Sequence, residues 1–159
     1  MRRLLLIVLV LTLAAGCGRT IEVEKVLQIT DVRTGWYDAG IVEDGKNKLV
    51  PSIALKLHNV IGEPVQRVDI WGIFKRVGET ETWGEHFVRG IGPAGLAGGA
   101  TGGEIVLRSS LGYTGTQPRM RMLQNQEFVD ARVEVFAKHG SRTWMKLGEY
   151  TIDRQLLTE

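Results

Sequence analysis

The feature that most constrains the fold of this chain is the regular alternation of apolar and polar residues. The clearest example places Val129, Ala131, Val133 and Val135 between Asp130, Arg132 and Glu134. A period of two puts successive side chains on opposite faces of a β-strand. The segment 129–135 is therefore predicted to be a strand with one buried face.

Several other segments carry a strand signal, and turn residues separate them at intervals of about 8–12 residues. Glycine is abundant, at 20 residues, and gathers in these turns. The predicted strands are 21–29, 53–57, 68–74, 83–89, 105–107, 129–135 and 144–152, with a loop over 35–47 and one or two helical turns within 117–128. This pattern predicts an all-β fold, an antiparallel β-sandwich of about seven strands.

The segment 68–74 is apolar in both phases of the alternation. Val68, Ile70 and Phe74 share one phase, while Trp71 and Ile73 occupy the other. If the first set faces the core, Trp71 and Ile73 point away from it. An aromatic and aliphatic pair on an outer sheet face is typical of an interaction surface, so both are candidates for binding a partner.

The first sixteen residues have the layout of a secretory signal peptide, which would form a helix ahead of the β-domain. Arg2 and Arg3 precede an apolar run, Leu4–Leu13, and small residues follow it. The run is too short for a comfortable bilayer span, which takes about 20 residues. We therefore expect a signal peptide over residues 1–16 and a single β-sandwich domain over residues 17–159.

The end of this segment, Leu13-Ala14-Ala15-Gly16-Cys17, resembles the bacterial lipobox. Ala14 stands where that motif prefers Leu. The resemblance implies cleavage before Cys17 and attachment of a lipid to its sulfur. Cys17 is the only cysteine of the chain, so it has no partner for an internal disulfide. Attachment of a lipid would explain a lone cysteine in an exported protein.

The charge balance argues against nucleic acid as a partner. Removal of Arg2 and Arg3 leaves 18 basic and 18 acidic side chains, whereas nucleic-acid binding requires an excess of positive charge. The stretch Gly90–Gly95 satisfies the G-x-G-x-x-G spacing of dinucleotide sites, but further glycines follow it where a helix is needed. We interpret it as part of a flexible crossover loop, with no nucleotide and no other cofactor.

The segment Leu55–Gly78 resembles a module of secreted bacterial lipoproteins, the FxLYD-type and LEA14-like sandwiches. The matching positions are Asn59, Gly62, Pro64-Val65, Val68, Phe74 and Gly78, with the later Leu96-Ala97-Gly98. The tetrad that names the module is absent after Phe74. The resemblance implies an immunoglobulin-like sandwich, a fold that serves many functions.

The sequence offers no catalytic constellation and no metal site. Its three histidines, His58, His86 and His139, lack a second ligand at metal-binding spacing. The remaining candidates are aromatic, since Trp36, Tyr37 and Trp83 could form a stacking platform for a carbohydrate or an apolar small ligand.

Together these observations predict a non-enzymatic lipoprotein of the cell envelope. It would be held to a membrane by the lipid on Cys17 and act as a binding or accessory module for another envelope protein. The alternative is a lipoprotein that binds a carbohydrate or an apolar small ligand. In a Gram-negative cell, an Asp directly after the lipidated cysteine resembles an inner-membrane retention signal. This chain has Gly18 at that position, which favours the periplasmic leaflet of the outer membrane.

Overall fold

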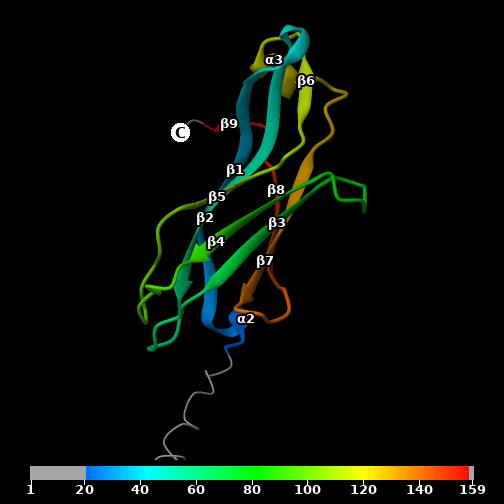
Figure 1. Cartoon of the computed structure of the whole chain (residues 1–159). Coiled ribbons are helices and arrows are strands. Elements are labelled where there is room, and N and C mark those ends of the chain that lie inside the picture. Colours follow the sequence, from blue (N-terminus) through cyan, green and yellow to red (C-terminus); the bar gives the residue numbers. More distant parts are fainter. Residues whose placement is uncertain (1–20, 158–159) are drawn as a thin grey trace, which may run out of the picture.

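The protein is an all-β sandwich of two sheets (Figure 1), as the sequence predicts. The computed structural model describes residues 21–157. Cys17 and the predicted signal peptide lie outside the described residues. None of the helices in residues 21–157 has the length and apolar character needed to cross a bilayer.

Two sheets make up the sandwich. The first has the order β5-β2-β1-β9, with β6 also paired to β2, and the second has the order β4-β3-β7-β8. All pairs are antiparallel except β1 with β9. The bounds are β1 Leu27–Ile41, β2 Asn47–Asn59, β3 Val68–Arg76, β4 Gly84–Ile91, β5 Ile105–Arg108, β6 Tyr113–Gly115, β7 Ala131–His139, β8 Met145–Thr151 and β9 Leu156–Leu157.

The core lies between the sheets and follows the alternation of the sequence. On β7, Val133 and Val135 are buried, and Glu134 points to the outer face. Ile53, Leu55 and Leu57 of β2, together with Val68, Ile70 and Phe74 of β3, are almost completely buried. Each such side chain contributes roughly 1.5–3 kcal/mol through its removal from water.

The N-terminal part of the described chain differs from the prediction. Residues Val23–Val26 form a short helix, α2, and β1 begins only at Leu27. The apolar residues Val23 and Leu27 are four positions apart and both are buried. That spacing is met by one helical turn, so packing of the turn overrides the alternation seen in 21–29.

The predicted loop over 35–47 is wrong for its first half, because β1 continues to Ile41 and only residues 42–46 connect it to β2. Its residues pair with β2 along a long hairpin, with Trp36 opposite Pro51 and Asp38 opposite Leu49. A short 3-10 turn, η2 (Glu43–Gly45), closes the hairpin. The predicted helical turns are confirmed as α3 (Arg119–Gln124), which lies beside the hairpin at the upper end of the molecule (Figure 1).

The glycine-rich connection between β4 and β5, residues 92–104, is tightly held rather than a loose crossover. Buried Asn59 donates hydrogen bonds from Nδ2 to the carbonyls of Leu96 and Ala97, at 3.2 and 3.1 Å. Gly98 packs so closely on Gly62 that a Cβ atom there would lie 2.2 Å from the Gly62 carbonyl oxygen. Glycine is needed here for close backbone approach, and these bonds correct the expectation of flexibility.

Candidate binding surface

The outer face of the four-stranded sheet carries Trp71 and Ile73, the two residues that the alternation of β3 predicted to lie there. Val68, Ile70 and Phe74 are buried between the sheets, while Trp71 and Ile73 lie on the opposite face and are only partly buried. The predicted orientation of Trp71 and Ile73 is therefore confirmed. Their role in binding a partner stays a prediction.

The strand register gathers further aromatic side chains around Trp71. Phe87 of β4 and Phe136 of β7 are its direct cross-strand neighbours, and residues paired in this way share a sheet face. Trp144, from the β7–β8 connection, reaches the same place. Its ring centroid lies 5.5 Å from that of Trp71 and 5.8 Å from that of Phe87.

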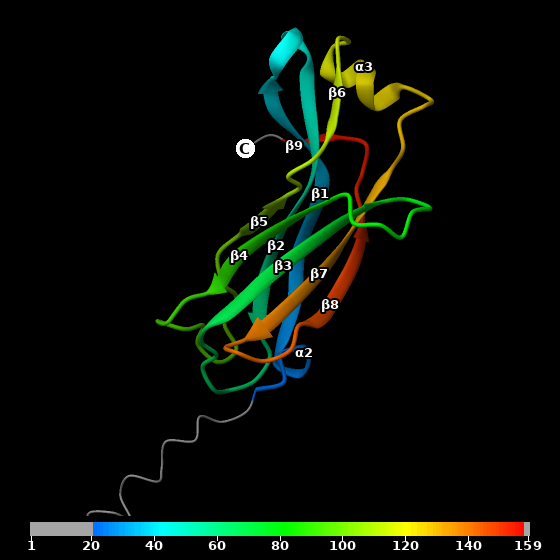
Figure 2. The ribbon, with the colours of Figure 1, turned by 45° about the vertical axis from the view of Figure 1, so that its right-hand side comes forward.

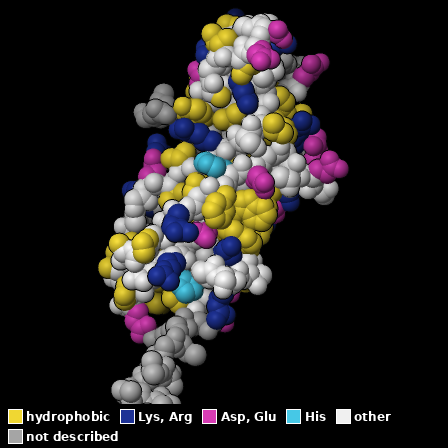
Figure 3. Space-filling model, viewed as in Figure 1, with side chains coloured by type: hydrophobic (Ala, Val, Ile, Leu, Met, Phe, Trp, Pro, Cys, Tyr) yellow, Lys and Arg dark blue, Asp and Glu magenta, His cyan; other side chains and the backbone are white. Residues whose placement is uncertain are grey.

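We call Trp71, Phe87, Phe136 and Trp144 the outer aromatic cluster. Phe87 is 54% exposed and the other three are partly buried. The space-filling view shows an apolar patch over β3 and β7 on the face turned to the viewer (Figure 3). Sequence reasoning found Trp71 but missed its neighbours, because only the register reveals which aromatic residues share its face.

Polar and charged side chains surround the outer aromatic cluster, and each of those described here interacts with another group of the protein. Trp71 Nε1 donates a hydrogen bond to Glu85 Oε2 at 3.1 Å. The ammonium of Lys138 lies 4.6 Å from the centre of the Trp144 ring, a cation–π contact. Arg89 Nε donates to Asp69 Oδ1 at 3.2 Å.

An ion-pair network centred on Glu134 adjoins the cluster. Lys146 Nζ lies 2.8 Å from Glu134 Oε1, and Lys75 Nζ lies 2.6 Å from Glu134 Oε2. Hydrogen bonds from these two ammonium groups lower the pKa of Glu134 from 4.5 to about 2. Hydrogen bonds from Lys146 also lower the pKa of Glu149, so the network holds its carboxylates ionised at neutral pH.

The predicted stacking platform of Trp36, Tyr37 and Trp83 does not form. Trp36 has no exposed surface and packs edge-on against Phe128, with ring centroids 4.6 Å apart. Trp83 is partly buried and lies 4.9 Å from Tyr113. The guanidinium of Arg108 covers the ring of Tyr37 at 3.6 Å. Trp36 belongs to the core and Trp83 packs against it, whereas Tyr37 lies under Arg108, so the three residues share no exposed face.

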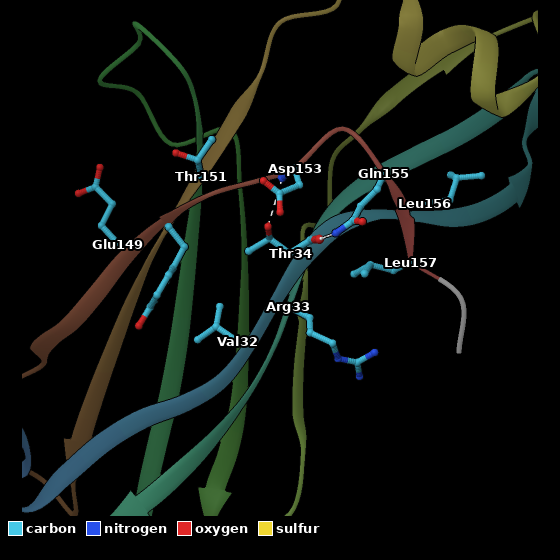
Figure 4. Close-up of a pocket in the computed structure, with 10 residues that line it drawn as sticks. Val32, Arg33, Thr34, Glu149, Thr151, Asp153, Gln155, Leu156 and Leu157 are labelled. Atoms are coloured by element: carbon cyan, nitrogen blue, oxygen red, sulfur yellow. Dashed lines mark hydrogen bonds between the residues drawn. The ribbon is translucent and has the colours of Figure 1, made fainter.

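A groove of about 560 Å³ runs between β1 and the C-terminal segment that includes β8 and β9. Figure 4 shows Thr34 between Asp153 and Gln155 in this groove. The backbone amide of Asp153 donates to Thr34 Oγ1 at 3.1 Å, and Gln155 Nε2 donates to the Thr34 carbonyl at 2.8 Å. The polar groups here bond to one another and fasten the end of the chain to the edge of β1.

The glycine-rich stretch and one of the three histidines singled out in the sequence both have a structural explanation. Gly90–Gly95 spans the end of β4 and a turn, and strand rather than helix follows it at β5. His86 Nδ1 accepts a hydrogen bond from the Arg108 amide at 2.9 Å and thereby joins β4 to β5. Among residues 21–157, no group of three or more His, Cys, Asp or Glu side chains could hold a metal ion.

Comparisons with protein-family models, with curated proteins and with solved structures found no match for this chain.

Proposed function

We propose that this protein is a non-enzymatic, lipid-anchored module of the cell envelope that binds another envelope protein through the outer aromatic cluster. The observation that carries the proposal is a continuous group of four packed aromatic rings on the outer face of the four-stranded sheet, with Phe87 exposed and the other three only partly buried. Aromatic residues in the centre of a patch dominate the binding energy of many protein–protein interfaces.

The composition of the patch favours a protein partner. Its centre is apolar, and charged groups around it interact within the protein: Arg89 forms an ion pair with Asp69, and Glu85 accepts a hydrogen bond from the neutral indole of Trp71. Interfaces between proteins share this arrangement of an apolar centre and a polar rim. A partner with an apolar patch could cover the rings while the internal pairs stay intact, so no buried charge would lose its partner.

The position of the patch also suits binding. Trp71, Phe87 and Phe136 lie on three adjacent strands that pair along most of their length. A rigid sheet fixes these rings before any partner arrives, which lowers the entropy lost on association. Trp144 comes from a connection, but the Trp71 and Phe87 rings and the Lys138 ammonium hold it in place.

Anchoring to the membrane rests on the sequence around Cys17. Growth with radiolabelled palmitate would show label on the wild-type protein and none on a Cys17→Ser variant. Label that persists in Cys17→Ser would disprove the anchor. For the binding surface, partners recovered after crosslinking in cells should be lost with Trp71→Ala, and an unchanged set of partners would remove Trp71 from the interface.

A further inference from the structure

Three connected pieces form the end of the sandwich at which Ile21, the first described residue, lies. These are α2, the β2–β3 connection (60–67) and the β4–β5 connection (92–104), which we call the basal end. The Val60 amide donates to the Val26 carbonyl at 3.0 Å, and the Gly99 amide donates to the Ile61 carbonyl at 3.0 Å. Figure 2 shows all three pieces at the lower end of the molecule, opposite the tip of the β1–β2 hairpin.

The β4–β5 connection, the largest of these pieces, has an unusual composition. Residues 92–103 include no charged side chain, although charged residues make up 24% of the chain. Pro93, Ala94 and Ala97 of this stretch are exposed, and Val60 beside it is 48% exposed. An exposed surface without charge loses less hydration energy than a charged surface when it approaches a low-dielectric phase.

A hollow of about 780 Å³ lies at the same end, between α2 and the β2–β3 connection. Ile21, Val26, Ile61 and Pro64 are among the residues that line it. Three charged residues line it as well: Glu22 and Lys25 form an ion pair with each other, and Glu63 is exposed. The basal end also carries the exposed charged residues Glu24, Glu63 and Arg67 on α2 and the β2–β3 connection. Its charge-free part is therefore the stretch 92–103 of the β4–β5 connection.

We propose that the basal end rests on the lipid surface and that the β1–β2 hairpin points away from it. This inference relies on the proposed lipid anchor at Cys17. Cys17 precedes Ile21 by four residues, and four residues span at most about 14 Å. A domain on so short a tether stays near the headgroups, and the basal end is the part of it that the anchor holds closest.

This orientation has a consequence for the outer aromatic cluster. With the basal end on the lipid, the outer faces of both sheets stand away from the bilayer and remain open to the surrounding compartment. A partner protein can then reach Trp71 and Phe87 from the side. The rival orientation lays the four-stranded sheet on the membrane and places the same rings among the headgroups.

The test uses the full-length lipidated protein in vesicles of phosphatidylethanolamine and phosphatidylglycerol that contain a headgroup-nitroxide lipid. If the lipid occupies Cys17, an added cysteine is the single reactive thiol of the protein. A fluorophore would be attached in turn at Ala97→Cys in the basal end, at Ile41→Cys in the hairpin and at Phe87→Cys in the aromatic cluster. Ile41 is 70% exposed, so its label reports the far end without disturbing the core.

We expect the nitroxide lipid to reduce the emission at Ala97→Cys and to leave the emission at Ile41→Cys and Phe87→Cys unchanged. Stronger quenching at Phe87→Cys would show the rival orientation and overturn the proposal. Equal quenching at all three positions, or none, in protein that sediments with the vesicles would also overturn it. Protein that neither sediments nor carries a lipid by mass spectrometry would instead refute the anchor, and the orientation with it.

Discussion

Trp71 and Trp144, which are far apart in the sequence, pack on the outer face of the four-stranded sheet with ring centroids 5.5 Å apart. Trp71 is fixed by its position on β3 and by a hydrogen bond to Glu85. Trp144 is brought over the sheet by the β7–β8 connection and is capped by Lys138. Two tryptophans held in this way outside the core form a surface whose rings are ordered before binding.

The outer aromatic cluster should contribute less to stability than its neighbours in the core. Phe87→Ala removes a ring that is 54% exposed, and we expect a loss of about 1 kcal/mol or less in the free energy of unfolding. Ile70→Ala, on the adjacent strand but completely buried, should cost about 2–5 kcal/mol. Urea denaturation of both variants checks this. Equal losses of unfolding free energy would mean that Phe87 is part of the core and does not serve as a free binding surface.

Asn59 should matter far more than another asparagine of the same strand. Its amide Nδ2 donates to the carbonyls of Glu63, Leu96 and Ala97, and its Oδ1 accepts from the Ile61 amide. Asn59→Ala leaves these groups without their partner and should cost about 2–4 kcal/mol. Asn47→Ala, the control, loses one exposed bond to the Gln117 carbonyl and should cost under about 1 kcal/mol. The two are compared by urea unfolding, and similar midpoints would contradict the account.

The close contact of Gly98 with Gly62 makes a second test of the β4–β5 connection. A methyl group at Gly98 would meet backbone, which moves less readily than a side chain. We expect Gly98→Ala to lower the unfolding free energy by about 1–3 kcal/mol, the usual cost of overpacking. Gly103→Ala meets nothing within 4 Å and should be neutral. If thermal melting finds both variants as stable as the wild type, Gly98 does not pack closely against the Gly62 backbone.

The low pKa of Glu134 predicts a dependence of stability on pH. Its pKa is about 2 in the folded protein, below the ordinary value of 4.5, so ionised Glu134 stabilises the fold above pH 4.5. That contribution, about 1–3 kcal/mol, is lost as the pH falls from 4.5 towards 2. Unfolding measured from pH 7 to pH 2 should show a smaller decline for Glu134→Gln than for the wild type. Parallel curves would show that the pairs with Lys75 and Lys146 do not stabilise the protein.

The sequence predicts the sandwich well because its alternation reports directly which residues face the core. The strands over 53–57, 68–74, 83–89 and 105–107 all fall within observed strands or one residue from them. It predicts poorly where pairing overrides local preference. Residues 35–41 have turn-forming composition, yet they form a strand because β2 supplies a partner along their length.

The sequence likewise predicts some residues of the candidate binding surface and misses others. The phase of β3 is enough to place Trp71 and Ile73 outside the core. Phe87, Phe136 and Trp144 join them only through the register of three strands and the path of a connection, which no short-range pattern contains. Trp36 illustrates the converse, since its ring is covered by Tyr113 of β6 and by Phe128, and a single strand pattern does not report those contacts.

Site-specific photocrosslinking at Phe87 in living cells tests the central claim most directly. A photoreactive amino acid at position 87 should give one discrete protein adduct, which disappears when Trp144→Ala is added. The same amino acid at position 41, on the hairpin, is the control and should give no such adduct. Absence of an adduct at position 87 in folded, lipidated protein, or an adduct that persists with Trp144→Ala, would contradict binding through the outer aromatic cluster.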